Sequence, residues 1–332
     1  KAMHTVSEIG ERSLIEIFMK HLTPMPDMPI PFWDDASAID IGNNRAIVVN
    51  TDMLVWETDI PKGMTPFQAA RKAVVMNISD LAAKGVKPIA FMPSLAIPSD
   101  YSVGDAEELL KGFEAGARMY DSYVVGGDTN EAYDVIISGL AMGITESKKI
   151  MKRDNGVKPG HKLAVTGDFG LTSAGFKYLL DDTPLPDALN ETILNSIYLP
   201  EARVNEGIAL AETGCVTSCM DSSDGLSVSL YDLMRSSGYG FTLDQIPVHP
   251  TAEKFAVYND LNPNDLALFG GEEYELVFTY SPRNRRKIAR ALEDVECELI
   301  TIGTVSESDE IVYAHEGEVV PIKKGGWDHF NA

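Results

Sequence analysis

The stretch that decides the fold is residues 65–85, TPFQAARKAVVMNISDLAAKG. Its first two residues suit a helix start, because Thr65 can cap free backbone N–H groups and Pro66 is tolerated at the first helical position. Apolar side chains then recur at helical spacing up to Gly85, which can end the helix. A helix so rich in Ala, Val, Ile and Leu is expected to be buried. The carboxylate of Asp80 inside it therefore needs a partner or a metal ion.

Outward from this helix, apolar runs alternate with helical patterns. The preceding strand is expected at 45–49, stopping at Asn50-Thr51-Asp52. Further strands are expected at 89–96, 123–125, 134–144, 162–166, near Phe241, at 274–279 and at 299–304, and further helices at 105–120, from about Leu171, and at 200–212, 224–235 and 284–292. This alternation predicts an α/β or α+β fold with mixed sheets.

The chain length predicts two domains. Its 332 residues exceed what one core usually serves. The polar, basic segment 145–161 ends in Lys158-Pro159-Gly160, which suits a domain connection. We expect the boundary near residue 148, giving domains 1–148 and 149–332.

Charge and cysteine content restrict the partners and the compartment. The formal net charge is −22, which would repel nucleic acid and anionic membrane surfaces. No apolar run approaches the roughly 18 residues of a membrane span, so a soluble protein is expected. The cysteines, Cys215, Cys219 and Cys297, cannot all pair and show no metal-site spacing, which favours core thiols in a reducing, cytoplasmic compartment.

Acidic side chains recur beside turn residues in four segments. These are Asp34-Asp35, Asn50-Thr51-Asp52, Gly126-Gly127-Asp128-Thr129 and Asp221-Ser222-Ser223-Asp224-Gly225. Taken singly, each is more typical of a turn or a helix cap. Together with Asp80 they supply the oxygen ligands that Mg²⁺ prefers. The chain has no GxxxxGK[ST] loop, GxSxG elbow, HExxH motif or dinucleotide fingerprint, so bound nucleotide phosphates would be held mainly through metal ions.

In order along the chain, these segments resemble one family closely. With Asn77-Ile78-Ser79-Asp80-Leu81-Ala82-Ala83, the segment 270–276 (GGEEYEL) and the closing 326–330 (GWDHF), they are similar to thiamine-monophosphate kinases from about residue 7 to residue 330. Single motifs are shared with aminoimidazole ribonucleotide synthetase, selenophosphate synthetase and the hydrogenase-maturation dehydratase. The resemblance implies a two-domain protomer of the aminoimidazole ribonucleotide synthetase-like fold, with N-terminal domains that pair in a homodimer.

The resemblance also implies a site. It assigns the metal ligands to Asp35, Asn50 or Thr51, Asp52, Asp80, Asp128, Asp221 and Asp224, the ATP contacts to Gly127, Asp128, Arg153 and Ser223, and the thiamine monophosphate side to Asp59, Glu272 and Trp327. The sequence departs from the family pattern at two positions: Trp33 stands where glycine is usual, and Asp59 where histidine is frequent.

The reaction expected from the resemblance is direct in-line transfer from ATP to thiamine monophosphate with Mg²⁺. Mg²⁺ held by the aspartates, Asp128 and Asp224 among them, offsets the developing charge, and Arg153 clamps phosphate oxygens. No general base is needed because the attacking phosphate is already anionic. The alternatives are another ATP-dependent synthetase of the superfamily and a non-catalytic acidic metal-binding protein. A selenophosphate synthetase would be expected to carry a reactive cysteine near its N-terminus, and the first cysteine here is Cys215.

Overall fold

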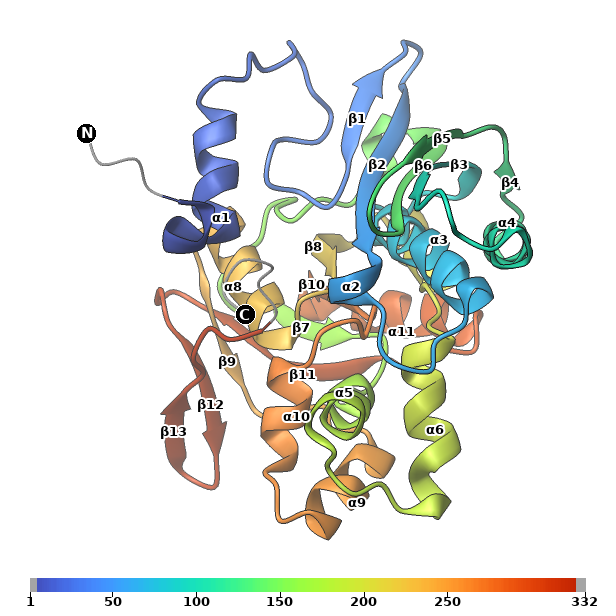
Figure 1. The fold of residues 1–332 in the computed structure, drawn as a ribbon. Coiled ribbons are helices and arrows are strands. Elements are labelled where there is room, and N and C mark those ends of the chain that lie inside the picture. Colours follow the sequence, from blue (N-terminus) through green and yellow to red (C-terminus); the bar gives the residue numbers. More distant parts are fainter. Residues whose placement is uncertain (1–4, 327–332) are drawn as a thin grey trace.

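The computed structural model describes residues 5–326 and confirms an α/β arrangement with two mixed sheets (Figure 1). Trp327 lies outside the described residues. The elements of the first half are α1 (Val6–Met19), β1 (Ser37–Asp40), β2 (Arg45–Val55), α2 (Trp56–Asp59), α3 (Pro66–Ala83), β3 (Pro88–Ile97), α4 (Val103–Arg118), β4 (Tyr123–Val124), β5 (Asp128–Glu131), β6 (Ile136–Glu146) and the 3-10 helix η1 (Ser147–Lys149).

The second half is built in the same way around a larger sheet. Its elements are β7 (Lys162–Val165), α5 (Leu171–Asp181), α6 (Asp187–Tyr198), α7 (Val204–Thr213), β8 (Val216–Asp221), α8 (Leu226–Ser237), β9 (Gly240–Leu243), α9 (Pro250–Tyr258), α10 (Pro263–Phe269), β10 (Leu276–Tyr280), η2 (Pro282–Asn284), α11 (Arg285–Glu293), β11 (Ile300–Ser306), β12 (Ile311–His315) and β13 (Glu318–Pro321).

Each half contains one sheet. The first has the order β1-β2-β6-β3-β4 with β5 also paired to β3, and it is antiparallel except where β4 and β5 join β3. The second has the order β13-β12-β9-β11-β7-β10-β8 and is antiparallel except for the β12–β9 pair. The boundary near residue 148 stays a prediction. The last strand of the first sheet ends at Glu146, and the next strand begins at Lys162.

Helix α3 is the expected buried helix, and it starts as predicted. The Thr65 side chain accepts from the Gln68 N–H at 3.2 Å, and the Gln68 side chain accepts from the Thr65 N–H at 2.9 Å. These reciprocal bonds satisfy two backbone donors at the helix start. Gly85 follows the helix with φ of +72°, a conformation that glycine adopts without a steric penalty.

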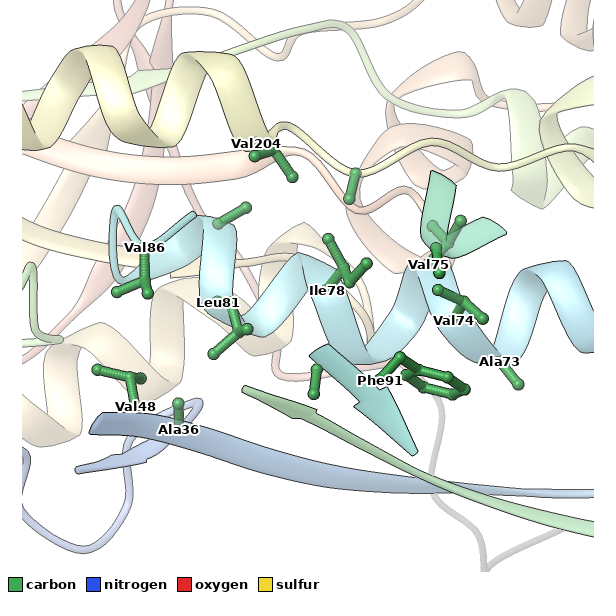
Figure 2. Close-up of a cluster of buried hydrophobic side chains, with 14 of the residues drawn as sticks. Ala36, Val48, Ala73, Val74, Val75, Ile78, Leu81, Val86, Phe91 and Val204 are labelled. Atoms are coloured by element: carbon green, nitrogen blue, oxygen red, sulfur yellow. The ribbon is translucent and has the colours of Figure 1, made fainter. Parts of the chain in front are cut away.

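The core of the first half surrounds α3. On one side, Leu81 points toward the sheet that carries Val48 and Phe91, and on the other side Ile78 points toward α7, which begins at Val204 (Figure 2). Close approach to α7 depends on a glycine of that helix: a Cβ at Gly207 would lie 2.0 Å from the Ala82 carbonyl oxygen. Because α3 also contacts β8, this helix joins the two halves of the chain.

One expected boundary is wrong. Strand β2 does not stop before Asn50 but continues to Val55, paired residue by residue with β6. The polar residues 50–52 therefore lie within a strand, because the full-length pairing with β6 satisfies their backbone groups. Strand β5, which begins at Asp128, was likewise not expected.

Candidate active site

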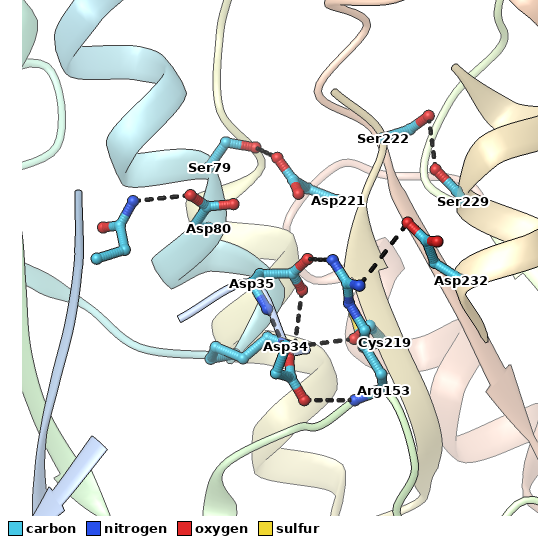
Figure 3. Close-up of polar contacts among 12 residues, drawn as sticks. Asp34, Asp35, Ser79, Asp80, Arg153, Cys219, Asp221, Ser222, Ser229 and Asp232 are labelled. Carbon is cyan, nitrogen blue, oxygen red and sulfur yellow. Dashed lines mark hydrogen bonds and ion pairs between the residues drawn. The ribbon is translucent and has the colours of Figure 1, made fainter. Parts of the chain in front are cut away.

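Three carboxylates from distant parts of the sequence converge beside α3. Asp35 lies in the loop before β1, Asp80 in the last part of α3, and Asp221 at the end of β8. One carboxylate oxygen of each lies within 4.8 Å of the others (Figure 3). The group combines side chains from both halves of the chain. The ligands expected from the sequence also come from both halves.

Burial and mutual repulsion act on two of these acids. The pKa of Asp80 is raised well above its usual value, first by burial and then by the charges of Asp52 and Asp221. Burial, followed by the charge of Asp35, raises the pKa of Asp221 to about 7, although Ser79 Oγ donates to its Oδ2 at 2.6 Å. A divalent cation placed among these carboxyl groups would stabilise their ionised form.

Asp35 differs because cations surround it. Burial acts to raise its pKa, but the charges of Arg153 and Lys84 outweigh burial and lower it. Arg153 Nη2 lies 2.6 Å from Asp35 Oδ1, and Lys84 Nζ lies 2.8 Å from Asp35 Oδ2. Asp35 is therefore ionised and held in place by two fixed positive charges.

These contacts form a chain of alternating charges that reaches α1. Lys84 also pairs with Asp34, whose Oδ2 accepts from the Arg153 backbone N–H at 3.0 Å. Arg153 Nη1 lies 3.8 Å from Asp232 Oδ2 (Figure 3). Asp232 in turn pairs with Arg12. Arg153 was expected to bind phosphate. It is an internal arginine whose Nε has no hydrogen-bond partner in the described structure.

The segment Asn50-Thr51-Asp52 is divided between the two faces of the first sheet. Asn50 Nδ2 donates to Asp80 Oδ2 at 2.7 Å, and the Asp52 N–H donates to Asn77 Oδ1 at 2.9 Å. Thr51 points to the opposite face because side chains alternate along a strand, and its Oγ1 lies 3.4 Å from Ser138 Oγ. Of the two ligands expected at 50 or 51, the structure brings only Asn50 to the carboxylates.

Gly127 and Asp128 lie at the edge of the first sheet. Asp128 begins β5 beside Ser94 of β3 and is exposed. Gly127 approaches the neighbouring strand closely, since a Cβ there would lie 2.6 Å from the Pro93 carbonyl oxygen. The structure does not include Asp128 in the group formed by Asp35, Asp80 and Asp221, and the assigned roles of Gly127 and Asp128 stay predictions.

The loop after Asp221 joins the carboxylates to the segment 270–276. Ser223 is exposed and Asp224 half-buried. The Ser223 carbonyl accepts from the Glu272 N–H at 2.6 Å, and the Ser222 carbonyl accepts from the Tyr274 N–H at 2.9 Å. Glu272 and Tyr274 have φ of +64° and +55°, so this segment adopts a conformation that L-residues rarely occupy.

The two described residues expected on the acceptor side meet the same lysine. Lys72 Nζ lies 2.6 Å from Glu272 Oε1 and 3.3 Å from the Asp59 carbonyl oxygen. The Asp59 carboxylate accepts from the Val55 N–H at 2.7 Å and so holds the turn into α2. Lys72 was not expected from the sequence, although a lysine inside a helix with a buried pattern is the same signal that pointed to Asp80.

The fold accommodates Trp33 at the position where the family usually has glycine. Trp33 has φ of +68°, the region that a glycine at this position would occupy freely. The Arg235 guanidinium lies 3.7 Å from the centre of the indole ring. This cation–π contact contributes to holding the residue in its unfavourable backbone conformation.

Two family models cover most of the chain. Residues 33–145 match the N-terminal domain of AIR synthase related protein, and residues 158–315 match its C-terminal domain. The fold and the convergent carboxylates thus define a protein of the AIR synthase-related class.

Closer relatives narrow this class. The thiamine-monophosphate kinase of Pyrococcus abyssi is 34% identical over 98% of this chain and 97% of its own length, and that of Nitrosopumilus maritimus is 33% identical over 98% and 100%. A solved structure described as AaThiL complexed with AMPPCP and TMP is 25% identical and superimposes with a TM-score of 0.86, covering 99% of this chain and 100% of that one. The chain belongs to the thiamine-monophosphate kinase family.

Proposed function

We propose that this protein transfers the γ-phosphoryl group of ATP to the phosphate of thiamine monophosphate, producing thiamine diphosphate and ADP. The observation that carries the proposal is the convergence of Asp35, Asp80 and Asp221 within 4.8 Å. The relatives named as thiamine-monophosphate kinases, and the related structure with AMPPCP and TMP, support ATP and thiamine monophosphate as the substrates. They favour this kinase over the synthetases that share single motifs with it.

The residues at the carboxylate group fit Mg²⁺. All three acids offer oxygen, the pKa values of Asp80 and Asp221 are raised by burial and neighbouring charge, and the buried Asn50 Oδ1 has no hydrogen-bond partner in the described part of the chain. Asp35, Asp80 and Asp221 would hold the ion, with Asn50 and Asp52 beside them. When bound, Mg²⁺ supplies charge neutralisation and alignment for phosphoryl transfer.

Arg153 and the loop residues would contact and orient the phosphates. The Arg153 side chain faces Asp35 and Asp232, so it orients one proposed metal ligand and keeps a positive charge beside the carboxylate group, where ATP phosphates would bind. Gly127 and Ser223 offer unhindered backbone and a hydroxyl to phosphate oxygens, and Asp128 and Asp224 offer further carboxylates. The attacking phosphate of thiamine monophosphate carries its own negative charge, so the protein needs to orient it rather than deprotonate it.

We also propose a homodimer formed through the first sheet. Thr51, Leu140 and Met92 lie side by side on the face opposite α3, and Met53 extends this row. Met53, Met92 and Leu140 are 54%, 41% and 37% exposed. Apolar side chains that gather on an exposed sheet face mark an association surface, and a second copy would bury them.

The location is proposed as cytoplasmic because the three cysteines are free thiols. Among the described residues, no helix is long and apolar enough to cross a membrane.

The function is tested by incubating the protein with ATP, Mg²⁺ and thiamine monophosphate and separating the products by chromatography. Thiamine diphosphate should accumulate with one ADP per turnover. An Asp80→Asn variant should form none, whereas Asp121→Asn, at an exposed acid far along the chain from the carboxylates, should match the unmodified protein. Formation of ADP and free phosphate alone would refute the kinase. Metal binding that is indifferent to nucleotide, without turnover, would favour the non-catalytic alternative.

A further inference from the structure

Lys72 is a buried cation at the contact between the two halves of the chain. Its side chain is fully buried, whereas that of its partner Glu272 is 25% exposed. Lys72 belongs to α3 in the first half, and Glu272 lies between α10 and β10 in the second. Burying an ammonium group costs free energy unless oxygen atoms accept its hydrogen bonds. The segments that supply these oxygens, one carboxylate and one carbonyl, are therefore held close to Lys72.

The oxygens come from the two segments expected on the acceptor side. Lys72 reaches Glu272 Oε1 at 2.6 Å and the Asp59 carbonyl at 3.3 Å, so one side chain holds the end of α2 and the segment 270–276 together. Lys72 and Ser79 are seven residues apart on α3, which places them on one face of the helix, roughly 10 Å apart along its axis. Ser79 donates to Asp221. The Lys72–Glu272 pair therefore lies about two helical turns from the carboxylate group, on the same side of α3.

The segment that carries Glu272 also connects directly to the loop after Asp221. The Glu272 N–H donates to the Ser223 carbonyl at 2.6 Å, in a stretch where Glu272 and Tyr274 both have positive φ. Such a conformation persists only where surrounding contacts hold it. Among the described residues, Lys72 is the only one whose side chain forms an ion pair with Glu272.

We infer that Lys72 is a positioning residue for the acceptor substrate: it orients Glu272 and neutralises its charge so that a phosphate ester carrying a cationic ring can bind beside them. This inference rests on the proposed function. With Oε1 engaged by Lys72, the 25% of the Glu272 side chain that is exposed would be left for the ligand, and the paired charges would not repel an incoming phosphate as an isolated carboxylate would. Lys72 acts through Glu272 and does not itself take part in phosphoryl transfer.

The test compares Lys72→Met, Glu272→Gln and the double variant with a control, Lys111→Met, which removes a lysine from an exposed pair with Glu108. Steady-state kinetics and thermal melting are measured for each. Lys72→Met should raise the KM for thiamine monophosphate at least tenfold while the KM for ATP changes less than about twofold, and it should lower the melting temperature.

The double variant separates positioning from stability. It has no unpaired buried charge, so its melting temperature should recover toward that of the unmodified protein while the KM for thiamine monophosphate stays raised. If Lys72→Met does not fold, the double variant takes its place in the kinetic test. Equal effects on both KM values, or a double variant with normal KM values, would overturn the inference. An unmodified protein that forms no thiamine diphosphate would instead refute the proposed function, and calorimetric titration with thiamine monophosphate would then still show whether Lys72 affects its binding.

Discussion

Replacing Lys84 by Met tests the charge balance around Asp34 and Asp35. Lys84 is fully buried, and the side chains of both partners are 2% exposed. Its Nζ contacts both carboxylates and donates to the Cys219 carbonyl at 3.0 Å, so each of its N–H groups has an acceptor. Methionine is an unbranched side chain one atom shorter than lysine, and it removes the charge.

The expected loss follows from what remains after the substitution. Arg153 still faces Asp35, but Asp34 keeps only backbone donors, from Asp35 at 2.9 Å and Arg153 at 3.0 Å. Removing one partner of a buried ion pair typically costs about 3–5 kcal/mol. For a cooperative unit of about 150–250 residues, that corresponds to a melting temperature lower by roughly 6–20 °C without Mg²⁺.

Mg²⁺ should then stabilise the variant more than the unmodified protein. A divalent ion at Asp35 replaces part of the missing positive charge, and tenfold tighter binding would add about 1.4 kcal/mol to the stabilisation at saturation. The assay is thermal and denaturant unfolding with and without Mg²⁺, with Lys111→Met as the exposed control. A loss below about 1 kcal/mol, or equal Mg²⁺ stabilisation of variant and unmodified protein, would refute the account of Lys84 as an internal counter-ion.

Three further outcomes are expected. Without metal, Asp80→Asn should be at least as stable as the unmodified protein, because the substitution removes a buried charge next to Asp52 and Asp221; a clear loss in denaturant unfolding would contradict this. Since the pKa of Asp221 is raised to about 7 in the fold from 3.8, its proton stabilises the metal-free protein at low pH, and that stabilisation is lost as the pH rises through 7. Unfolding of Asp221→Asn should therefore depend less on pH between 5 and 8, and an unchanged pH profile would exclude this. Mg²⁺ and a non-hydrolysable ATP analogue should raise the melting temperature more than additively, and indifference to both would mean that the acids form only a structural cluster.

The helix at 65–83 could be predicted because its signals are local. A cap at Thr65, Pro66 in the first position and a continuous apolar pattern are properties of neighbouring residues, and the structure confirms the helix almost to the residue. The length of β2 could not be predicted in this way. Its pairing with β6, more than 80 residues away, carries the strand past Asn50 to Val55, and such pairing leaves no local pattern in the sequence.

The site residues likewise include some with a local sequence signal and some without one. The resemblance assigned Asp35, Asp80 and Asp221 as ligands, and of these only Asp80 stood out by itself, as an acid inside an apolar helix. Acids beside turns, such as Asp35 and Asp221, are more typical of a turn or a helix cap when taken singly. Lys72 and Lys84 did not stand out, since a lysine on a helix is ordinarily solvated.

Yet both lysines meet the criterion that was applied to Asp80. Each is a charged residue in or directly after a stretch of Ala, Val, Ile and Leu that must be buried, and each is fully buried in the structure. In a helix enclosed by other elements, a charged side chain needs a hydrogen-bond partner or an opposite charge from another part of the chain. The four charged residues of 65–85 are thus the places where the rest of the protein supplies a partner: the Pro200 carbonyl for Arg71, Glu272 for Lys72, Asn50 for Asp80, and Asp34 with Asp35 for Lys84.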